Sequence, residues 1–337
     1  MGAGKHSMIE HRRHGCLTGC LIRILVLLGI ASLLFVTACM TGILTNDAVT
    51  GEPVISFNNV RAPDLTGFQL DFSSIGTTVQ EWTKKIPAIE WPYGVNAHGL
   101  TAKVLHAGDG ECILICSDGY VMIADAGSGS GNWISGQMLL GGIKHINVLA
   151  ALSSDDTNIG GMKTLVSRYK PGYLIYQDSQ VKSSAYNAMM NAAEKINGLQ
   201  VLSASKGMNF QLGRAGVSVV GPVNTYHADS RDDGLSLRID YGHTRILLLG
   251  TIGSDGGQDL SAPGRDVIAD VLIAGNGGAA LSAQLLSAVR PRYVLVAGKP
   301  DEAAISRART WGASVYQMSE NGVMSVYTDG TVLSFSK

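Results

Sequence analysis

A short segment between a predicted strand and a predicted helix constrains this chain most. Residues 146–152 are apolar apart from Asn147, which predicts a buried strand. A polar tip follows at 153–158, and Gly160-Gly161 then allow the backbone to turn tightly into a helix at 162–169. The segment has the outline of a metal-binding loop, but its tip contains no histidine, and among Ser153, Asp155, Thr157 and Asn158 only Asp155 is a good ligand for a divalent metal.

The rest of the chain from about residue 98 alternates between predicted strands and predicted helices. Strands are expected at 100–106, 111–117, 119–125, 173–176, 199–203, 208–212, 216–220, 235–241, 245–250, 270–274, 293–297, 313–317, 323–327 and 331–335. Helices are expected at 133–140, 182–196, 280–289 and 302–311 as well. Strand-rich blocks with interleaved helices predict an α/β (α+β) fold, in which two sheets lie between outer helices.

The first 97 residues have a different composition. Residues 24–44 carry no charged side chain, over about the ~20 residues that a helix needs to cross a bilayer. Arginines precede this run, and the next basic residue after it is Arg61, so the N-terminus is expected in the cytoplasm. The predicted organisation is a cytoplasmic tail, a transmembrane signal anchor, a stalk or linker and an extracytoplasmic domain, at 1–20, 21–44, 45–97 and 98–337.

A second interpretation of the apolar run remains open. Val36-Thr-Ala-Cys39 resembles a bacterial lipoprotein cleavage box, which would make Cys39 the lipidated first residue of the mature chain. Both interpretations predict one tether to the bacterial cytoplasmic membrane and a body outside the cytoplasm.

Charge and cysteine usage narrow the possible functions. The net charge is -1, and the basic residues form no stripe of the kind that binds nucleic acid non-specifically. A nucleic-acid partner is therefore possible but has no support from charge. The five cysteines form no disulfide framework, and Cys112 and Cys116 are expected to be buried thiols on one face of a strand.

Several segments together resemble a known family. They are Val104–Ile115, Val121–Gly127, Leu152–Gly161, Asp232–Thr251, Asp270–Gly278 and Val289–Val296. In this order they resemble the metallo-β-lactamase-like C-terminal domain of ComEC, the DNA-uptake channel protein of competent bacteria, and its free-standing relatives. The resemblance implies a metallo-β-lactamase-like αββα sandwich over residues 98–337.

The resemblance also implies where metal ligands would lie, and most of them are missing. The family's ligand positions fall on Ser153, Asp155, Thr157, Asn158, Thr251, Gly275 and Asn276. Asp125, usually structural in the family, is a further weak candidate. A catalytic zinc site needs about three protein ligands and an open position. We therefore expect a pseudoenzyme with no catalytic residue and no metal, in which the listed positions are vestigial.

Two other features of the loops could supply a site. His227 is the best single candidate for a surviving functional group, although a turn or surface histidine is the plainer interpretation. Loop acids could also gather carboxylates for Ca²⁺ or Mg²⁺, although we interpret them as solvated: Asp155, Asp156, Asp229, Asp232 and Asp233.

The expected function is binding or scaffolding in the cell envelope, with an unknown protein or polymer as partner and a possible link, through the resemblance, to DNA uptake. The alternative is a divergent metal-dependent hydrolase of the phosphodiesterase or nuclease type, which would use Zn²⁺ or Mn²⁺.

Overall fold

The computed structural model describes residues 45–46, 53–54, 98–108, 110–318 and 323–336. The apolar run at 24–44 and nearly all of the predicted stalk lie outside these residues. The chain divides into the units Met1–Phe72 and Ser73–Lys337. In the first unit, β1 (Thr45–Asn46) and β2 (Pro53–Val54) pair as antiparallel strands. No helix in the described part is long and apolar enough to cross a membrane.

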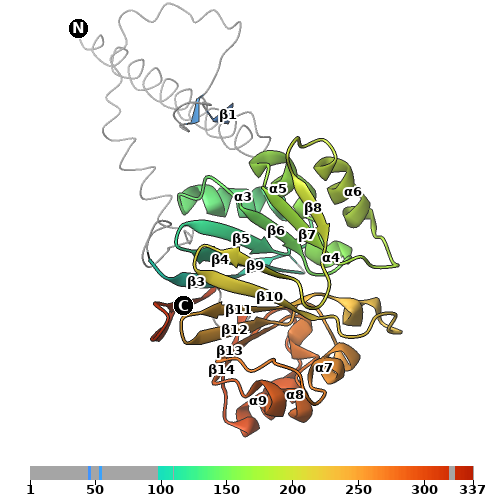
Figure 1. Cartoon of the computed structure of the whole chain (residues 1–337), viewed down its shortest axis with the longest axis vertical. Coiled ribbons are helices and arrows are strands. Elements are labelled where there is room, and N and C mark those ends of the chain that lie inside the picture. The colour runs from blue at the N-terminus through green and yellow to red at the C-terminus, as the bar shows by residue number, and fades with distance from the viewer. Residues whose placement is uncertain (1–44, 47–52, 55–97, 109, 319–322, 337) are drawn as a thin grey trace, which may run out of the picture. The chain divides into compact units, whose positions relative to one another are not determined.

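The second unit contains two mixed sheets (Figure 1). The first has the strand order β17-β16-β3-β4-β5-β6-β7-β8, antiparallel as far as β5 and parallel from β5 to β8. Its strands are β3 (Leu100–Ala107), β4 (Gly110–Ser117), β5 (Tyr120–Ala124), β6 (Val148–Ala151), β7 (Tyr173–Tyr176), β8 (Gln200–Ser203), β16 (Met324–Thr328) and β17 (Leu333–Ser336).

The second sheet has the order β15-β14-β13-β12-β11-β10-β9. The pairs from β9 to β12 are antiparallel, and those from β12 to β15 are parallel. Its strands are β9 (Asn209–Leu212), β10 (Ala215–Gly221), β11 (Ser236–Tyr241), β12 (Thr244–Leu248), β13 (Val271–Ala274), β14 (Tyr293–Val296) and β15 (Ser314–Gln317).

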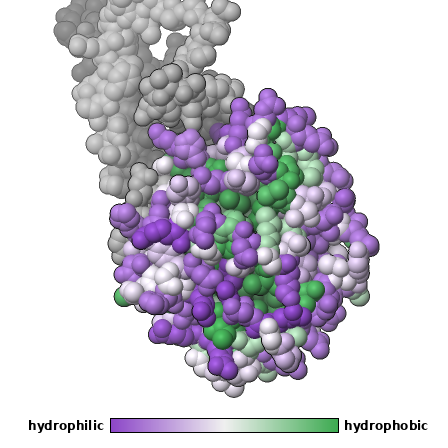
Figure 2. Space-filling view, viewed as in Figure 1, coloured by the Kyte–Doolittle hydropathy of each residue, from purple (hydrophilic) through white to green (hydrophobic). Residues whose placement is uncertain are grey.

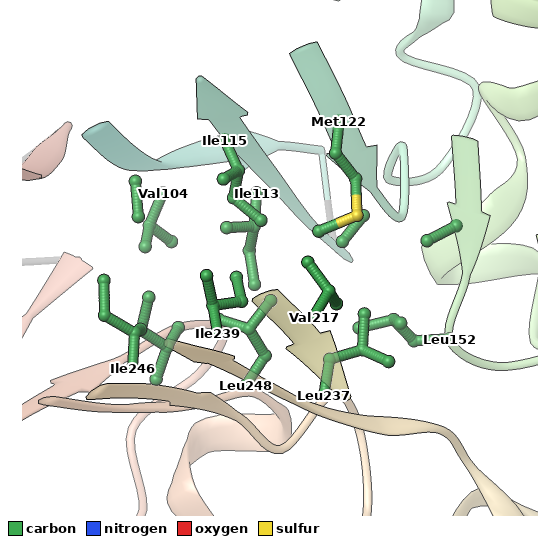
Figure 3. Packing of buried hydrophobic residues seen from close by; sticks show 14 of the residues in the cluster. Val104, Ile113, Ile115, Met122, Leu152, Val217, Leu237, Ile239, Ile246 and Leu248 are labelled. Carbon is green, nitrogen blue, oxygen red and sulfur yellow. The ribbon is translucent and has the colours of Figure 1, made fainter. Parts of the chain in front are cut away.

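The helices cover the outer faces of the two sheets. The first sheet packs against α3 (Gly131–Leu140), α5 (Met162–Tyr169) and α6 (Ser184–Ala193), and the second against α7 (Ser254–Leu260), α8 (Ala283–Val289) and α9 (Glu302–Trp311). A third apolar cluster fills the space between the sheets (Figure 3). Hydrophilic residues are spread over the outer surface around an apolar band on the face that Figure 2 shows. The layers are therefore helix, sheet, sheet, helix.

Strand β4 shows how the sequence produces these layers. Ile113 and Ile115 point into the core between the sheets, whereas Cys112, Leu114 and Cys116 belong to the core under the helices. Successive side chains of a strand point to opposite faces, so a strand covered on both sides is apolar throughout. Both cysteines are buried and free, which confirms the expectation.

The predicted strands and helices of residues 98–337 are confirmed, mostly to within three residues at each end. The sequence patterns did not predict two short helices, α4 (Asp156–Ile159) and α7, or two 3₁₀ helices, η1 (Ser230–Asp233) and η2 (Asn276–Gly278). The expected polar tip at 153–158 is thus partly helical. These elements are short or rich in glycine and aspartate, so helix propensity gives no signal for them.

Candidate functional site

One cavity collects most of the vestigial positions. It has a volume of about 180 Å³ and is lined by Gly110, Glu111, Asp155, Thr157, Asn158, Arg231, Thr251, Asn276, Gly298 and Lys299. Thr251 follows β12 and Asn276 follows β13, whereas the loop after β6 carries the other three. The site therefore lies where the ends of strands from both sheets meet. Five of the seven positions line it, all except Ser153 and Gly275.

Asp155 is engaged in holding its own helix. It is the N-cap of α4, and its Oδ1 accepts hydrogen bonds from Thr157 N at 2.9 Å and Thr157 Oγ1 at 3.0 Å. Asn158 Nδ2 in turn donates to Thr157 Oγ1 at 3.2 Å. Side-chain oxygens at this position satisfy backbone N–H groups that have no partner in the helix. The best metal ligand expected from the sequence is thus part of a capping network.

The two remaining vestigial positions are buried behind the cavity. Ser153 Oγ accepts a hydrogen bond from Asp155 N at 3.4 Å. At Gly275, a Cβ atom would lie 2.3 Å from Glu111 Oε1 and 2.5 Å from Gly250 O. Because the second of these atoms belongs to the backbone, position 275 has no room for a side chain, and certainly none for the histidine that the resemblance places there.

Glu111 is the site residue that sequence reasoning missed. It is 2% exposed, and neither of its carboxylate oxygens has a hydrogen-bond partner among the described residues. Burial raises the pKa of its carboxyl group from 4.5 to about 7, because the charged form is poorly solvated there. A signal was present in the sequence: Glu111 is an acid at the start of a strand that is otherwise apolar enough to be buried on both faces.

Asp125 lies behind the cavity rather than in its lining. It has a positive φ of 56°, and its Oδ1 accepts a hydrogen bond from Leu152 N at 2.9 Å, which ties the end of β5 to the end of β6. Its Oδ2 has no partner in the described part of the chain. Burial and the nearby charge of Glu111 raise the pKa of Asp125 well above its usual range. Asp125 therefore has a structural role here.

Two cationic side chains line the opening of the cavity. Arg231 forms an ion pair with Asp229, with Nε 3.0 Å from Oδ1, and its Nη1 reaches Asn276 Oδ1 at 3.4 Å. Lys299 is exposed and forms no ion pair within the described residues. The cavity thus combines an acidic, acceptor-rich interior with a positive mouth.

His227 lies outside this cavity and is held between two carboxylates. Its Nδ1 is 2.6 Å from Asp233 Oδ1, and its Nε2 is 3.1 Å from Asp259 Oδ2. Burial alone would lower the pKa of His227, but hydrogen bonds and charge from Asp233 and Asp259 outweigh burial and raise it. His227 therefore fastens its loop to α7, and the interpretation as a plain turn or surface histidine is incomplete.

The acidic loop residues do not form a cation site. Asp232 and Asp233 are buried, so their interpretation as solvated acids is wrong. Asp232 Oδ1 accepts hydrogen bonds from Gly253 N at 2.7 Å and Gly256 N at 2.8 Å, at the start of α7. Within the described ranges, no three histidine, cysteine, aspartate or glutamate side chains are arranged to hold a metal ion.

Comparison with known proteins gives distant structural likeness and nothing closer. No protein-family model matches the chain, and no curated protein matches it. It is similar to the metallo-β-lactamase fold protein YhfI from Bacillus subtilis, with a TM-score of 0.47 and 11% identity, covering 66% of this chain and 96% of that one. It is also similar to a metal-dependent hydrolase of the β-lactamase superfamily, with a TM-score of 0.47 and 10% identity, covering 65% of this chain and 96% of that one.

A metallo hydrolase from the archaeon Ignicoccus hospitalis gives a TM-score of 0.45 and 13% identity, covering 70% of this chain and 99% of that one. These likenesses concern the mixed two-sheet α/β fold. TM-scores below 0.5 at such low identity say nothing of the ligand or reaction of this chain.

Proposed function

We propose that this protein is a non-catalytic binding protein of the bacterial cell envelope, built on a metallo-β-lactamase-like domain of the ComEC type. One observation carries the proposal. Five of the seven positions that the sequence resemblance assigns to metal ligands line one cavity, yet they supply hydroxyl and amide groups and a single carboxylate, Asp155, which already caps a helix.

This set of side chains does not fit a catalytic zinc ion. Zinc hydrolases use about three histidine, cysteine or carboxylate ligands, and the ion lowers the pKa of its bound water to about 7. Here the place of one family histidine is Gly275, where any Cβ atom would collide with Gly250 O. The retained cavity therefore suits binding better than metal-assisted hydrolysis.

Membrane attachment is part of the proposal and rests on the apolar run at 24–44. That run would hold the domain outside the cytoplasm, whether as an uncleaved anchor or through a lipid on Cys39. A role linked to DNA uptake rests only on the ordered segments quoted above. The net charge of -1 favours a protein or small-molecule partner over DNA.

Metal content tests the proposal directly. Purified full-length protein is incubated with Zn²⁺, Mn²⁺ and Ca²⁺, desalted and analysed by elemental mass spectrometry, beside the Asp155→Ala variant. We expect no stoichiometric metal in either protein. One or two tightly held ions per chain in the unaltered protein, lost in Asp155→Ala, would overturn the proposal.

A divergent hydrolase is the second candidate, because two carboxylates, Glu111 and Asp155, line the cavity and both oxygens of Glu111 are unpartnered. That candidate predicts Mn²⁺- or Zn²⁺-stimulated cleavage of a generic phosphodiester such as bis(p-nitrophenyl) phosphate, abolished by Asp155→Ala. The same cleavage rate with and without added metal, in both proteins, would exclude it.

A further inference from the structure

The cavity is lined by buried polar side-chain atoms that no described protein group satisfies. Both oxygens of Glu111 are buried without a donor, and Thr251 Oγ1 is also buried without a partner among the described residues. Buried polar atoms are almost always hydrogen-bonded in native proteins, and an unpaired buried carboxylate is especially costly. A buried carboxylate that lines a cavity and has no protein donor is a place where a bound group can donate hydrogen bonds.

We propose that this cavity binds a small zwitterion, whose primary ammonium group donates to Glu111 and whose anionic group lies between Arg231 and Lys299 at the mouth. The inference rests on the proposed function, since it gives the ligand class of the same non-catalytic binding site.

The chemistry of the interior selects the ammonium end. Only a cation offsets the charge of the Glu111 carboxylate, and the Asp155 carboxylate lines the same cavity. A neutral hydroxyl group of a ligand would donate hydrogen bonds to Glu111 but would leave the charge of Glu111 without a counter-ion. No aromatic side chain lines the cavity, so the cage that recognises quaternary ammonium groups is missing. An ammonium group has three N–H donors for acceptors of this kind.

The mouth selects the anionic end. Lys299 has no ion pair within the described ranges, whereas Arg231 is paired with Asp229 and also feels the charges of Asp155 and Asp232. Lys299 is therefore the cationic side chain at the opening to which a carboxylate or phosphate would bind. The cavity volume of about 180 Å³ is smaller than the ~300 Å³ or more of ordinary small-molecule pockets, so the cavity suits a small ligand.

The test uses full-length protein and a set of matched probes. Isothermal titration calorimetry compares glycine, β-alanine, 4-aminobutyrate and 5-aminopentanoate, which vary the distance between the two charges. Butylamine lacks the anion and butyrate lacks the cation. We expect at least one ω-amino acid to bind, and both single-charge analogues to bind about 10-fold or more weakly than it.

Two variants assign the charges to residues. Glu111→Gln keeps the shape of the side chain and removes its charge, and we expect it to weaken zwitterion binding by about 10-fold. Lys299→Gln is expected to weaken zwitterion binding while leaving butylamine unaffected. The matched controls are Glu194→Gln and Lys163→Gln. Glu194 is the exposed C-cap residue of α6, and Lys163 is an exposed residue of α5, so both changes should leave binding unchanged. Thermal unfolding confirms that each variant is folded.

The inference is overturned if no member of the length series binds, if butylamine binds as tightly as 4-aminobutyrate, or if Glu111→Gln binds like the unaltered protein. These results leave the proposed function standing as long as the protein holds no metal. Retained metal overturns the proposed function itself, so the two failures are distinguishable.

Discussion

At the scale of single residues, Glu111 links the stability of the domain to its candidate site. A group whose pKa is raised by folding favours the folded state at low pH, and this contribution is lost as the pH rises through the folded pKa. Folding raises the pKa of the Glu111 carboxyl group from 4.5 to about 7. Below pH 4.5 the carboxyl group therefore does not lower the free energy of unfolding. Between pH 4.5 and 7 it lowers this free energy increasingly, and above pH 7 the loss reaches about 3 kcal/mol.

Replacing Glu111 with Gln should remove this dependence. We expect the Glu111→Gln variant to be more stable than the unaltered protein at pH 8, by up to about 3 kcal/mol, and to lose that advantage near pH 4.5. Urea unfolding at a series of pH values measures the difference. Glu194→Gln, an exposed replacement of the same type, should follow the unaltered protein throughout. An advantage of Glu111→Gln that is constant with pH would contradict the assignment.

The sequence predicted the residues of the site unevenly. The resemblance placed Asp155, Thr157 and Asn158 on one loop, and they do line one cavity with Thr251 and Asn276. It did not point to Glu111, because the signal for this residue was an acid at the start of an otherwise apolar strand and not one of the family's ligand positions. Nor could it predict that Asp155 would be used as a helix cap, since that depends on a helix of one turn.

At the scale of elements, the loop between β10 and β11 brings Arg231 to the cavity, and α7 holds that loop in place. Asp232 Oδ1 accepts two N–H groups from the first turn of α7, and His227 bridges Asp233 to Asp259 on the same helix. These contacts join segments of irregular backbone that local sequence patterns do not describe. Helix α7 was not predicted because two of its seven residues are glycine, which has a low helix propensity.

The capping contact of Asp232 should therefore carry much of the stability of this region. Asp232→Ala leaves the N–H groups of Gly253 and Gly256 without their charged acceptor, and we expect it to cost about 2–4 kcal/mol. Chemical denaturation measures the loss, and limited proteolysis of folded protein should show faster cleavage within 222–234. The control Asp255→Ala changes an exposed acid in the first turn of the same helix and should cost under about 1 kcal/mol. Equal losses in the two variants would show that Asp232 is not a special contact.

At the scale of the whole described domain, the alternation of strands and helices was enough to predict two sheets between outer helices, because period and length are local properties of the sequence. The strand order was not predictable in this way. Strand β16, in the C-terminal hairpin, pairs with β3 at the start of the domain, with Val326 opposite Ala102. Pairings between distant segments depend on the register of the assembled core, which no local pattern encodes.

This closing strand predicts that the two sheets unfold together. Val326 is fully buried in the core between the sheets, and Thr328 Oγ1 lies 2.8 Å from Thr244 Oγ1 of the other sheet. Val326→Ala should cost about 2 kcal/mol, because it removes two buried methyl groups and leaves a cavity. Val332→Ala, in the turn after β16, alters a side chain that is 61% exposed and should cost under about 0.5 kcal/mol.

Because the core is shared, the destabilisation should appear in both sheets at once. Hydrogen exchange at β5–β6 and at β12–β13 should accelerate by a similar factor in Val326→Ala, and circular dichroism should show one transition. Faster exchange confined to β3, β16 and β17 would instead mean that the C-terminal hairpin opens independently of the remaining core.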